Sequence, residues 1–306
     1  MLRRAILALL PALATTGMAA ATTMEFDGQP RTFEMYVPPT APRPLPIVLL
    51  LHGGRATAEQ MRRYTAFDDL ATREDILAVY PQGIGGQWND GRPQVGTLNA
   101  RAADSDDVKF LLELIDTLVE RGLADAKRVY AAGISNGGMM ALRLACEHPE
   151  RLAAVAVVAA NQPEALDCHP AVPVPIIFFH GTNDRFMPYG GGQILQWANL
   201  DRGKVLSATD SVGTWRKING CTGQPKRTRL SDTSSTRNQL LSIERVTYKP
   251  CAGAPVIRYI ARGGGHAWPG AKQGPGGDAI LGPADVGLDA NQVIWDFFKA
   301  QPERQQ

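Results

Sequence analysis

The chain has 306 residues, of which 44% are hydrophobic and 20% are charged, an ordinary composition for a globular protein with a substantial core. Its net charge is +2, and no Lys/Arg cluster accompanies that mild excess, so nothing points to a nucleic-acid or anionic-membrane partner. We find no internal repeat, low-complexity tract or linker that would mark a second module. The composition therefore favours one domain, of a size that α/β folds often use.

The N-terminal segment has the three-part layout of a secretory signal peptide. A positive start at Arg3 and Arg4 precedes a short apolar run and a stretch of small residues that ends at Ala21. The apolar run is too short to span a bilayer comfortably, which disfavours a retained anchor. We predict that residues 1–21 are a signal peptide, that residues 22–306 form a single domain, and that the protein is secreted.

Apolar runs of strand length alternate with amphipathic segments along the rest of the chain. A hairpin is predicted around Asp27-Gly28, where apolar residues recur with period two. Buried strands are predicted at 46–54, 76–83, 128–135, 152–161, 173–184 and 255–265, and helices at 58–74, 106–122, 136–150 and 290–301. This alternation predicts an α/β fold with a mainly parallel central sheet and helices on both faces. Ligands bind such sheets at the carboxyl ends of the strands.

One serine stands between a predicted strand and a predicted helix. Gly133-Ile134-Ser135-Asn136-Gly137 fits G-x-S-x-G, the nucleophile-elbow pattern of α/β-hydrolases. The five letters alone are a weak signal, and a small residue in a glycine-rich bend is the alternative. The strand–turn–helix context is the one that the elbow requires, so we predict an α/β-hydrolase fold with Ser135 as the nucleophile.

A serine nucleophile needs a base to remove its proton and an acid to orient that base. In α/β-hydrolases the three residues follow the order Ser, Asp or Glu, His. His266 comes late in the chain and in a glycine-rich loop, whereas the earlier candidates stand at a helix end, in a Pro-rich connection and at a strand end (His148, His169, His180). Asp184 directly follows a strongly apolar strand. We predict His266 as the base and Asp184 as the acid; a surface-loop histidine and a turn carboxylate are the alternatives.

The negative charge of a tetrahedral intermediate needs hydrogen-bond donors. In this fold they are the N–H group after the nucleophile, here that of Asn136, and one from the loop after an early strand. The stretch "LLLHGGRAT" provides that loop, with Gly54 as the favoured donor and Arg55 as the alternative. His52 is predicted to be a structural hydrogen-bonding residue at the end of a buried strand, and not a base.

The cysteines are even in number, which favours two disulfides in an exported chain. None lies in a CxxC pair or in a Cys/His cluster with zinc spacing, so no metal site is predicted. Three connectivities are possible. Position in the chain favours Cys146–Cys168, around the strand after Ser135, and Cys221–Cys251, at the ends of a polar excursion that is expected to contribute little core.

Seven motifs occur together in one order: "LLLHGG", "YPQGIGGQWNDGR", "DSDDVKFL", "GISNGGMMALRLACEHPERLAAVAVVAAN", "HGTNDRFMPYGGG", "WRKINGC" and "GGGHAWPG". In them the chain resembles secreted polyhydroxybutyrate depolymerase-like and feruloyl or acetylxylan esterase-like proteins, grouped with carbohydrate esterase family 1. The resemblance runs from about Pro46 to the predicted C-terminal helix. It implies the same nucleophile, acid, base and oxyanion donors that were chosen above (Ser135, Asp184, His266, Gly54, Asn136).

The resemblance also implies that Trp88 and Trp268 border the substrate cleft, although composition alone fits core tryptophans equally well. Asp106 and Asp107 match a family motif, but at a helix start they are expected to be caps. The family shows cysteines in the setting of the second predicted disulfide. Gly54 stands where fungal and polymer-degrading relatives often carry Cys, and no appended polymer-binding module is found. These departures favour soluble esters or oligomers over solid polymer.

We therefore predict an exported serine carboxylic-ester hydrolase that works through an acyl-enzyme and needs no cofactor. Its substrates are expected to be hydroxyalkanoate oligomers, or feruloyl or acetyl esters of plant polysaccharide. An acyltransferase, a serine peptidase and a non-catalytic binding protein on the same fold are the alternatives. The acyl and alcohol groups, the oligomeric state, and the choice between periplasm and medium stay open from sequence.

Overall fold

The computed structural model describes residues 21–93, 105–195, 202–234, 240–273, 277–284 and 287–304. The predicted signal peptide, apart from its last residue, lies outside these ranges. Within them, none of the helices combines the length and the apolar character needed to cross a membrane.

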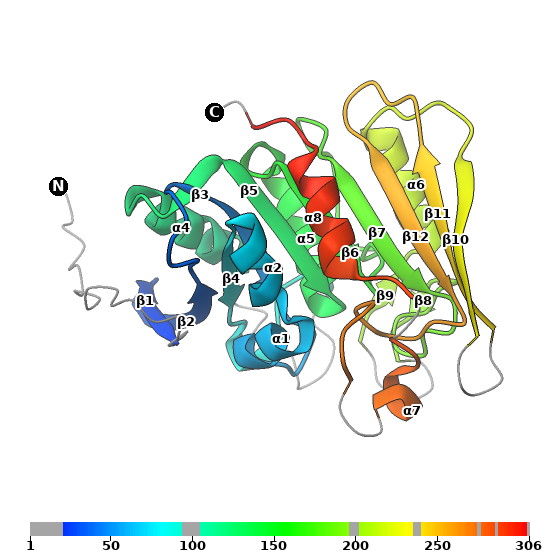
Figure 1. The fold of residues 1–306 in the computed structure, drawn as a ribbon, viewed down its shortest axis with the longest axis horizontal. Helices are drawn as coiled ribbons and strands as arrows, with labels where there is room; N and C mark the ends of the chain where they lie inside the picture. Colours follow the sequence, from blue (N-terminus) through cyan, green and yellow to red (C-terminus); the bar gives the residue numbers. More distant parts are fainter. Residues whose placement is uncertain are drawn as a thin grey trace.

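Parallel strands form the centre of a sheet that has ten strands in the described chain (Figure 1). In spatial order the parallel strands are β4 (Leu77–Pro81), β3 (Leu45–Leu51), β5 (Ala124–Ile134), β6 (Ala154–Val158), β7 (Ile176–Gly181) and β12 (Val256–Arg262). Every residue of β3, β4, β6 and β7 is buried, as expected for strands that are covered on both faces. The predicted buried strands are thereby confirmed.

Antiparallel strands extend the sheet at both edges. On one side β1 (Thr22–Phe26) and β2 (Gln29–Tyr36) form the predicted hairpin, and its turn residues Asp27 and Gly28 have φ values of 48° and 74°. Such left-handed pairs match the twist of a two-residue hairpin. On the other side β11 (Leu240–Tyr248) and β10 (Lys226–Ser234) continue beyond β12.

The excursion between Cys221 and Cys251 is richer in core residues than predicted. Its strand β11 sends Leu241 and Ile243 into one face of the sheet and Val246 and Tyr248 into the other, and all four side chains are buried. Their spacing within "LLSIERVTY" alternates before and after Glu244, which is the signature of a strand. The expectation of little core was wrong because the polar residues around this strand obscured the alternation.

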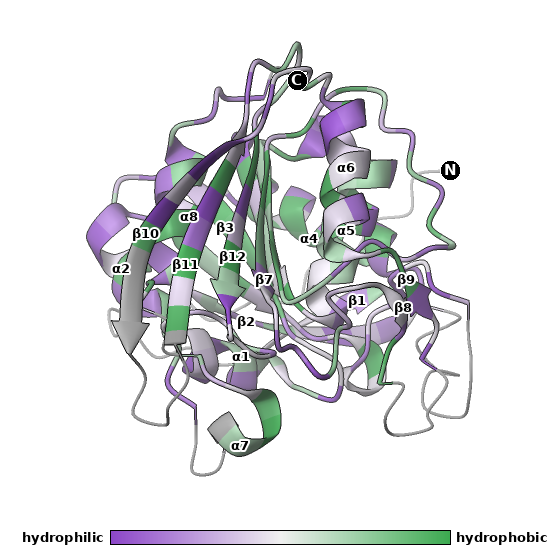
Figure 2. Ribbon diagram, turned by 90° about the vertical axis from the view of Figure 1, so that its right-hand side faces the viewer, coloured by the Kyte–Doolittle hydropathy of each residue, from purple (hydrophilic) through white to green (hydrophobic). Residues whose placement is uncertain are grey.

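Helices cover both faces of the sheet, as Figure 2 shows with the sheet seen nearly edge-on. One face carries α4 (Asp107–Glu120), α5 (Asn136–Glu147) and α6 (Ala208–Ile218); the other carries α1 (Ala58–Thr65), α2 (Phe67–Glu74) and α8 (Ala290–Lys299). Smaller elements lie in the connections: η1 (Ile84–Gly86), η2 (Pro149–Arg151), β8 (Gly192–Gln193), β9 (Lys204–Val205) and α7 (Gly277–Leu281). Buried apolar side chains form a separate core on each face. This is the predicted α/β fold.

The single helix predicted over 58–74 is in fact two helices. The chain breaks at Ala66, which has φ 48° and ends α1 with a hydrogen bond from its N–H to Arg62 O at 2.9 Å. On one straight helix Met61 and Phe67 would point about 120° apart, at about 100° per residue. The break allows both side chains to enter the same core, where they are 2% and 0% exposed. Packing therefore overrides a local pattern that has neither Gly nor Pro at the break.

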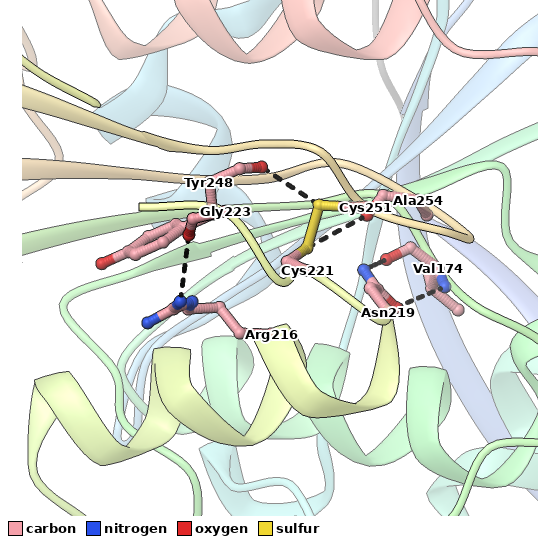
Figure 3. Close-up of a disulfide and its surroundings, with 8 residues drawn as sticks. All are labelled: Val174, Arg216, Asn219, Cys221, Gly223, Tyr248, Cys251 and Ala254. Carbon is pink, nitrogen blue, oxygen red and sulfur yellow. Dashed lines mark hydrogen bonds between the residues drawn. A yellow bond between two sulfur atoms is a disulfide. The ribbon is translucent and has the colours of Figure 1, made fainter. Parts of the chain in front are cut away.

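Both disulfides have the predicted pairing. Cys146 on α5 is bonded to Cys168 after β6, and Cys221 after α6 is bonded to Cys251 between β11 and β12 (Figure 3). Beside the second bond, the Asn219 side chain exchanges hydrogen bonds with both backbone groups of Val174, at 2.8 and 3.3 Å. This region thus joins the end of α6 to the starts of β7 and β12.

Candidate active site

Ser135 forms the turn between β5 and α5. Its backbone has φ 56° and ψ −122°, a conformation that side-chain-bearing residues rarely adopt and that folds tolerate mainly at functional sites. Its N–H donates to Val158 O at 2.9 Å, and its carbonyl accepts from Met139 N–H at 3.0 Å. The result is the sharp strand-to-helix turn of a nucleophile elbow.

The two glycines of the G-x-S-x-G pattern make this turn sterically possible. A Cβ atom on Gly133 would lie 2.3 Å from Gly137 O, and one on Gly137 would lie 2.2 Å from Leu51 O. Both distances are far below van der Waals contact. A side chain at Gly133 would push the first turn of α5 away from β5, and one at Gly137 would push it away from β3. The motif is therefore a requirement of this packing and not merely a pattern of small residues.

Asp184 and His266 meet beside the end of β7. His266 Nδ1 lies 2.7 Å from Asp184 Oδ2, so the ring N–H donates to the carboxylate. The other carboxylate oxygen accepts the N–H groups of Phe186 at 2.8 Å and Met187 at 2.7 Å. The aspartate side chain is 3% exposed and the histidine side chain 10%. The carboxylate fixes the imidazole with Nδ1 protonated, which leaves Nε2 to accept a proton.

Ser135 and His266 line the same pocket, which has a volume of about 350 Å³. No hydrogen bond joins their side chains in the described chain; such contacts often tighten only when a substrate binds. Much of the pocket wall is apolar: Met61, Ile134, Met139, Phe186, Met187, Ile194, Leu195 and Leu281. The pocket can therefore hold an apolar group beside the Ser135 hydroxyl.

Gly54, in the turn after β3, and Asn136, the first residue of α5, both line this pocket. Free N–H groups and the helix dipole make a helix N-terminus favourable for negative charge. The alternative donor, Arg55, already gives its backbone N–H to Gly86 O at 2.7 Å. Gly54 is therefore the residue of this turn that fits the donor role.

His52 is the structural residue that the sequence analysis predicted. Its ring is fully buried; Nδ1–H donates to Gly53 O at 2.8 Å, and Nε2 accepts from Gly83 N–H at 3.0 Å. Burial lowers the pKa of His52 to about 4, so the ring stays neutral and keeps one donor and one acceptor. It thereby ties the turn that carries Gly54 to the loop after β4.

The two tryptophans expected at the cleft are placed elsewhere. Neither is among the described residues that line the pocket, and their side chains are 3% and 1% exposed. Trp88 Nε1–H donates to His52 O at 3.0 Å, and Trp268 Nε1–H donates to Asn291 Oδ1 at 2.9 Å. An indole whose N–H finds a partner inside the protein is stably buried. Both residues therefore support the pocket wall from behind, which corrects the expectation of substrate contact.

The side chain of Asn136 organises the loop after β4, a role that was not predicted from sequence. Its Oδ1 accepts from Trp88 N–H at 2.8 Å, and its Nδ2–H donates to Asp90 Oδ2 at 2.6 Å. Asp90 in turn binds Arg92 through both carboxylate oxygens. Trp88 and Asp90 belong to the motif "QWNDGR", but nothing in that sequence indicates that it binds the residue after Ser135.

The remaining polar residues named from sequence lie outside the pocket wall. Asp106 caps α4 by accepting from Lys109 N–H at 3.0 Å, as predicted. Asp107, which was also expected to be a cap, is instead the first helical residue; it is buried and pairs with Arg31 at 2.8 Å, so it stabilises the fold. The ring of His180 is also buried, which lowers its pKa to about 3.

Residues 31–172 match the model of the esterase PHB depolymerase family. The protein NocK of Nocardia uniformis subsp. tsuyamanensis is 29% identical over 283 residues, which are 89% of this chain and 80% of that protein. The chain is a carboxylic ester hydrolase related to this family.

Other similar proteins are named as feruloyl or acetyl xylan esterases. Feruloyl esterase B of Piromyces equi is 29% identical to the esterase over 252 residues, which are 77% of this chain but 42% of that protein. The acetyl xylan esterase from Aspergillus awamori shares the fold of this chain. Its TM-score is 0.57 and its identity 16%, over 82% of this chain and 94% of that one. The esterase thus spans less than half of the feruloyl esterase and nearly all of the acetyl xylan esterase.

Proposed function

We propose that the esterase is an exported serine hydrolase that cleaves carboxylic esters through a Ser135–His266–Asp184 triad. The observation that carries this proposal is the 2.7 Å hydrogen bond between Asp184 and His266 on the wall of the pocket that the strained Ser135 turn also lines. A binding protein would have no use for this combination of an oriented imidazole and a strained serine turn.

The proposed reaction uses each of these groups in turn. Ser135 Oγ attacks the ester carbonyl while His266 Nε2 takes its proton, and Asp184 stabilises the imidazolium that forms. The backbone N–H groups of Gly54 and Asn136 donate to the oxyanion. The imidazolium then protonates the departing alcohol, which leaves an acyl-enzyme. Water, deprotonated by His266, attacks this acyl-enzyme and releases the acid.

The pocket favours soluble esters or short oligomers as substrates. At about 350 Å³ it lies near the lower end of the range for small-molecule sites, and its apolar wall suits an aliphatic or aromatic acyl group. Hydroxyalkanoate oligomers and feruloyl or acetyl esters both fit this description. Relatives that are named feruloyl esterase and acetylxylan esterase support the second class.

Export is supported by two independent features. The N-terminal sequence has a signal-peptide layout, and all four cysteines are paired in disulfides. Disulfides of this kind persist in oxidising compartments. Fractionation of the producing cells would place the mature protein, and N-terminal sequencing should find cleavage near Ala21.

A fluorophosphonate probe tests the triad directly, because it reacts only with an activated serine. We expect it to label Ser135, and we expect the purified esterase to hydrolyse members of a panel of p-nitrophenyl esters, methyl ferulate, acetylated xylan and hydroxybutyrate oligomers. Ser135→Ala should abolish labelling and lower turnover ~10³-fold or more. Labelling at another residue, or near-native turnover by a folded Ser135→Ala protein, would overturn the proposal.

A further inference from the structure

The permanent charges on the described pocket wall are all positive. Among the described residues that line it, the permanently charged side chains are those of Arg55, Arg92 and Arg202, and no Asp or Glu is present. The three arginines come from separate segments of the chain, after β3, after η1 and before β9. A concentration of one sign of charge beside apolar walls strengthens the local potential and attracts the opposite charge.

Arg92 is the fixed member of this group. Its guanidinium binds Asp90 at 2.7 to 3.0 Å, and Asp90 is 3% exposed and held by Asn136. Arg92 Nη1 also donates to Arg202 O at 2.5 Å. Its own charge is therefore balanced, and its role is to hold the backbone of Arg202 at the pocket.

Among the described residues, Arg55 and Arg202 have no counterion. In the described part of the chain neither side chain makes an ion pair or hydrogen bond. Arg202 is partly buried, and the pKa of its guanidinium is lowered by that burial and by the charges of Arg55 and Arg92. Crowded positive charge of this kind costs stability in the free enzyme, and a bound anion would relieve that cost.

We propose that the esterase is selective for esters that carry a free carboxylate, which Arg55 and Arg202 bind while the ester carbonyl lies at Ser135. This inference rests on the proposed function and narrows its substrate class. A guanidinium recognises a carboxylate through charge-assisted, often bidentate hydrogen bonds. The free-acid end of a hydroxyalkanoate oligomer carries such a group, whereas a neutral feruloyl or acetyl ester does not.

A matched pair of substrates separates charge from shape. The test compares kcat/KM for a 3-hydroxybutyrate trimer with a free carboxylate against the same trimer ending in a carboxamide. We expect the acid to be preferred by about tenfold or more, the range of a charge-assisted hydrogen bond. The preference should appear mainly in KM and should weaken at high ionic strength, since partly exposed charges are screened.

Arginine variants test the residues themselves. The acid-over-amide ratio should fall severalfold in Arg55→Gln and in Arg202→Gln and approach one in the double variant. Arg63→Gln is the matched control, because Arg63 lies on α1, is 79% exposed and pairs with Glu59; its ratio should equal that of the unmodified enzyme. Protection of Ser135 from the fluorophosphonate by each trimer, measured before an appreciable share of the trimer is hydrolysed, gives a second readout.

The outcomes distinguish this inference from the proposed function. A ratio near one, a ratio that the arginine variants leave unchanged, or equal protection by acid and amide would overturn carboxylate selectivity while leaving the triad intact. Absence of both labelling and hydrolysis of every ester would instead overturn the proposed function itself.

Discussion

The Oδ2 atom of Asp184 lies 2.7 Å from Nδ1 of His266, although 82 residues separate the two in the chain. The other oxygen of the same carboxylate is held by two backbone N–H groups. The aspartate is thus fixed by the loop after β7, and the histidine is oriented by the aspartate. A change at Asp184 that keeps the oxygen facing these N–H groups should therefore act on His266 without moving the loop.

We expect Asp184→Asn to lower kcat by about 10³- to 10⁴-fold while leaving the fold unchanged. The Asn carbonyl can still accept the N–H groups of Phe186 and Met187, but its amide N–H would then face His266 Nδ1 and favour the wrong tautomer. Circular dichroism and thermal melting should match the unmodified enzyme. Retention of more than a tenth of the activity would show that the hydrogen bond has no catalytic role.

A glycine pair tests the packing of the nucleophile turn. Gly137→Ala should destabilise the protein by several kcal/mol, because its Cβ would lie 2.2 Å from Leu51 O, or should displace Ser135 and lower activity by at least 10²-fold. Gly213→Ala is the control: Gly213 also lies in a helix, and a Cβ there meets nothing within 4 Å. That change should be neutral or stabilise by up to about 1 kcal/mol. Equal melting temperatures and activities for the two variants would contradict the steric account.

The residues of the proposed site could be predicted from sequence because each of them has a local signal. The elbow at Ser135 needs a strand, a sharp turn and a helix in direct succession, and these are visible in one short stretch. The strand end before Asp184 and the loop around His266 are equally local signals. The order of elements fixes which strand ends share an edge of the sheet, so it also indicates that these three residues can meet.

The features that the sequence concealed depend on packing between distant segments. Ala66 adopts a left-handed conformation because the helix break lets side chains on both sides of it pack into the core. The identity of residue 66 does not indicate this break. Trp88 and Trp268 are buried because their N–H groups find partners in other segments. The meeting of Arg55 and Arg202 at one pocket likewise depends on loops that are far apart in sequence. Pattern and propensity carry no information about such convergence.

Acid should destabilise the folded esterase through His52 and His180. Burial lowers their folded-state pKa values to about 4 and about 3, from the ordinary 6.5. Between pH 6.5 and 4 the unfolded chain binds protons at both rings that the folded chain does not, so the free energy of unfolding must fall as pH falls. For His52 alone the loss approaches roughly 3 kcal/mol by pH 4. Urea titrations at several pH values would measure the slope.

The variant His52→Gln tests whether His52 causes the fall in unfolding free energy at low pH. Gln cannot take up a proton, so its stability should decline less steeply between pH 6.5 and 4, even though it starts from a lower value. His169→Gln is the matched control, since the ring of His169 is 86% exposed, and its profile should follow that of the unmodified protein. Parallel profiles for all three proteins would show that His52 titrates in the folded state as it does in the unfolded one.

The Cys221–Cys251 disulfide should contribute both stability and alignment of the site. Closing a loop with a sequence separation of 30 residues restricts the unfolded chain by about 3.5 kcal/mol on the loop-entropy model. The bond also fixes the start of β12, the strand that leads to His266. Replacing both cysteines by serine should therefore lower the melting temperature. Activity should decline at temperatures well below the new melting transition, because the base loses its alignment with Ser135 before the sheet unfolds.

Thermal inactivation and circular dichroism, followed on the same samples, provide the measurement. The Cys146→Ser, Cys168→Ser variant is the comparison, because that disulfide lies at the far end of α5 from Ser135. Loss of activity that coincides with global unfolding in both variants would show that the bond between Cys221 and Cys251 stabilises the fold without aligning the triad.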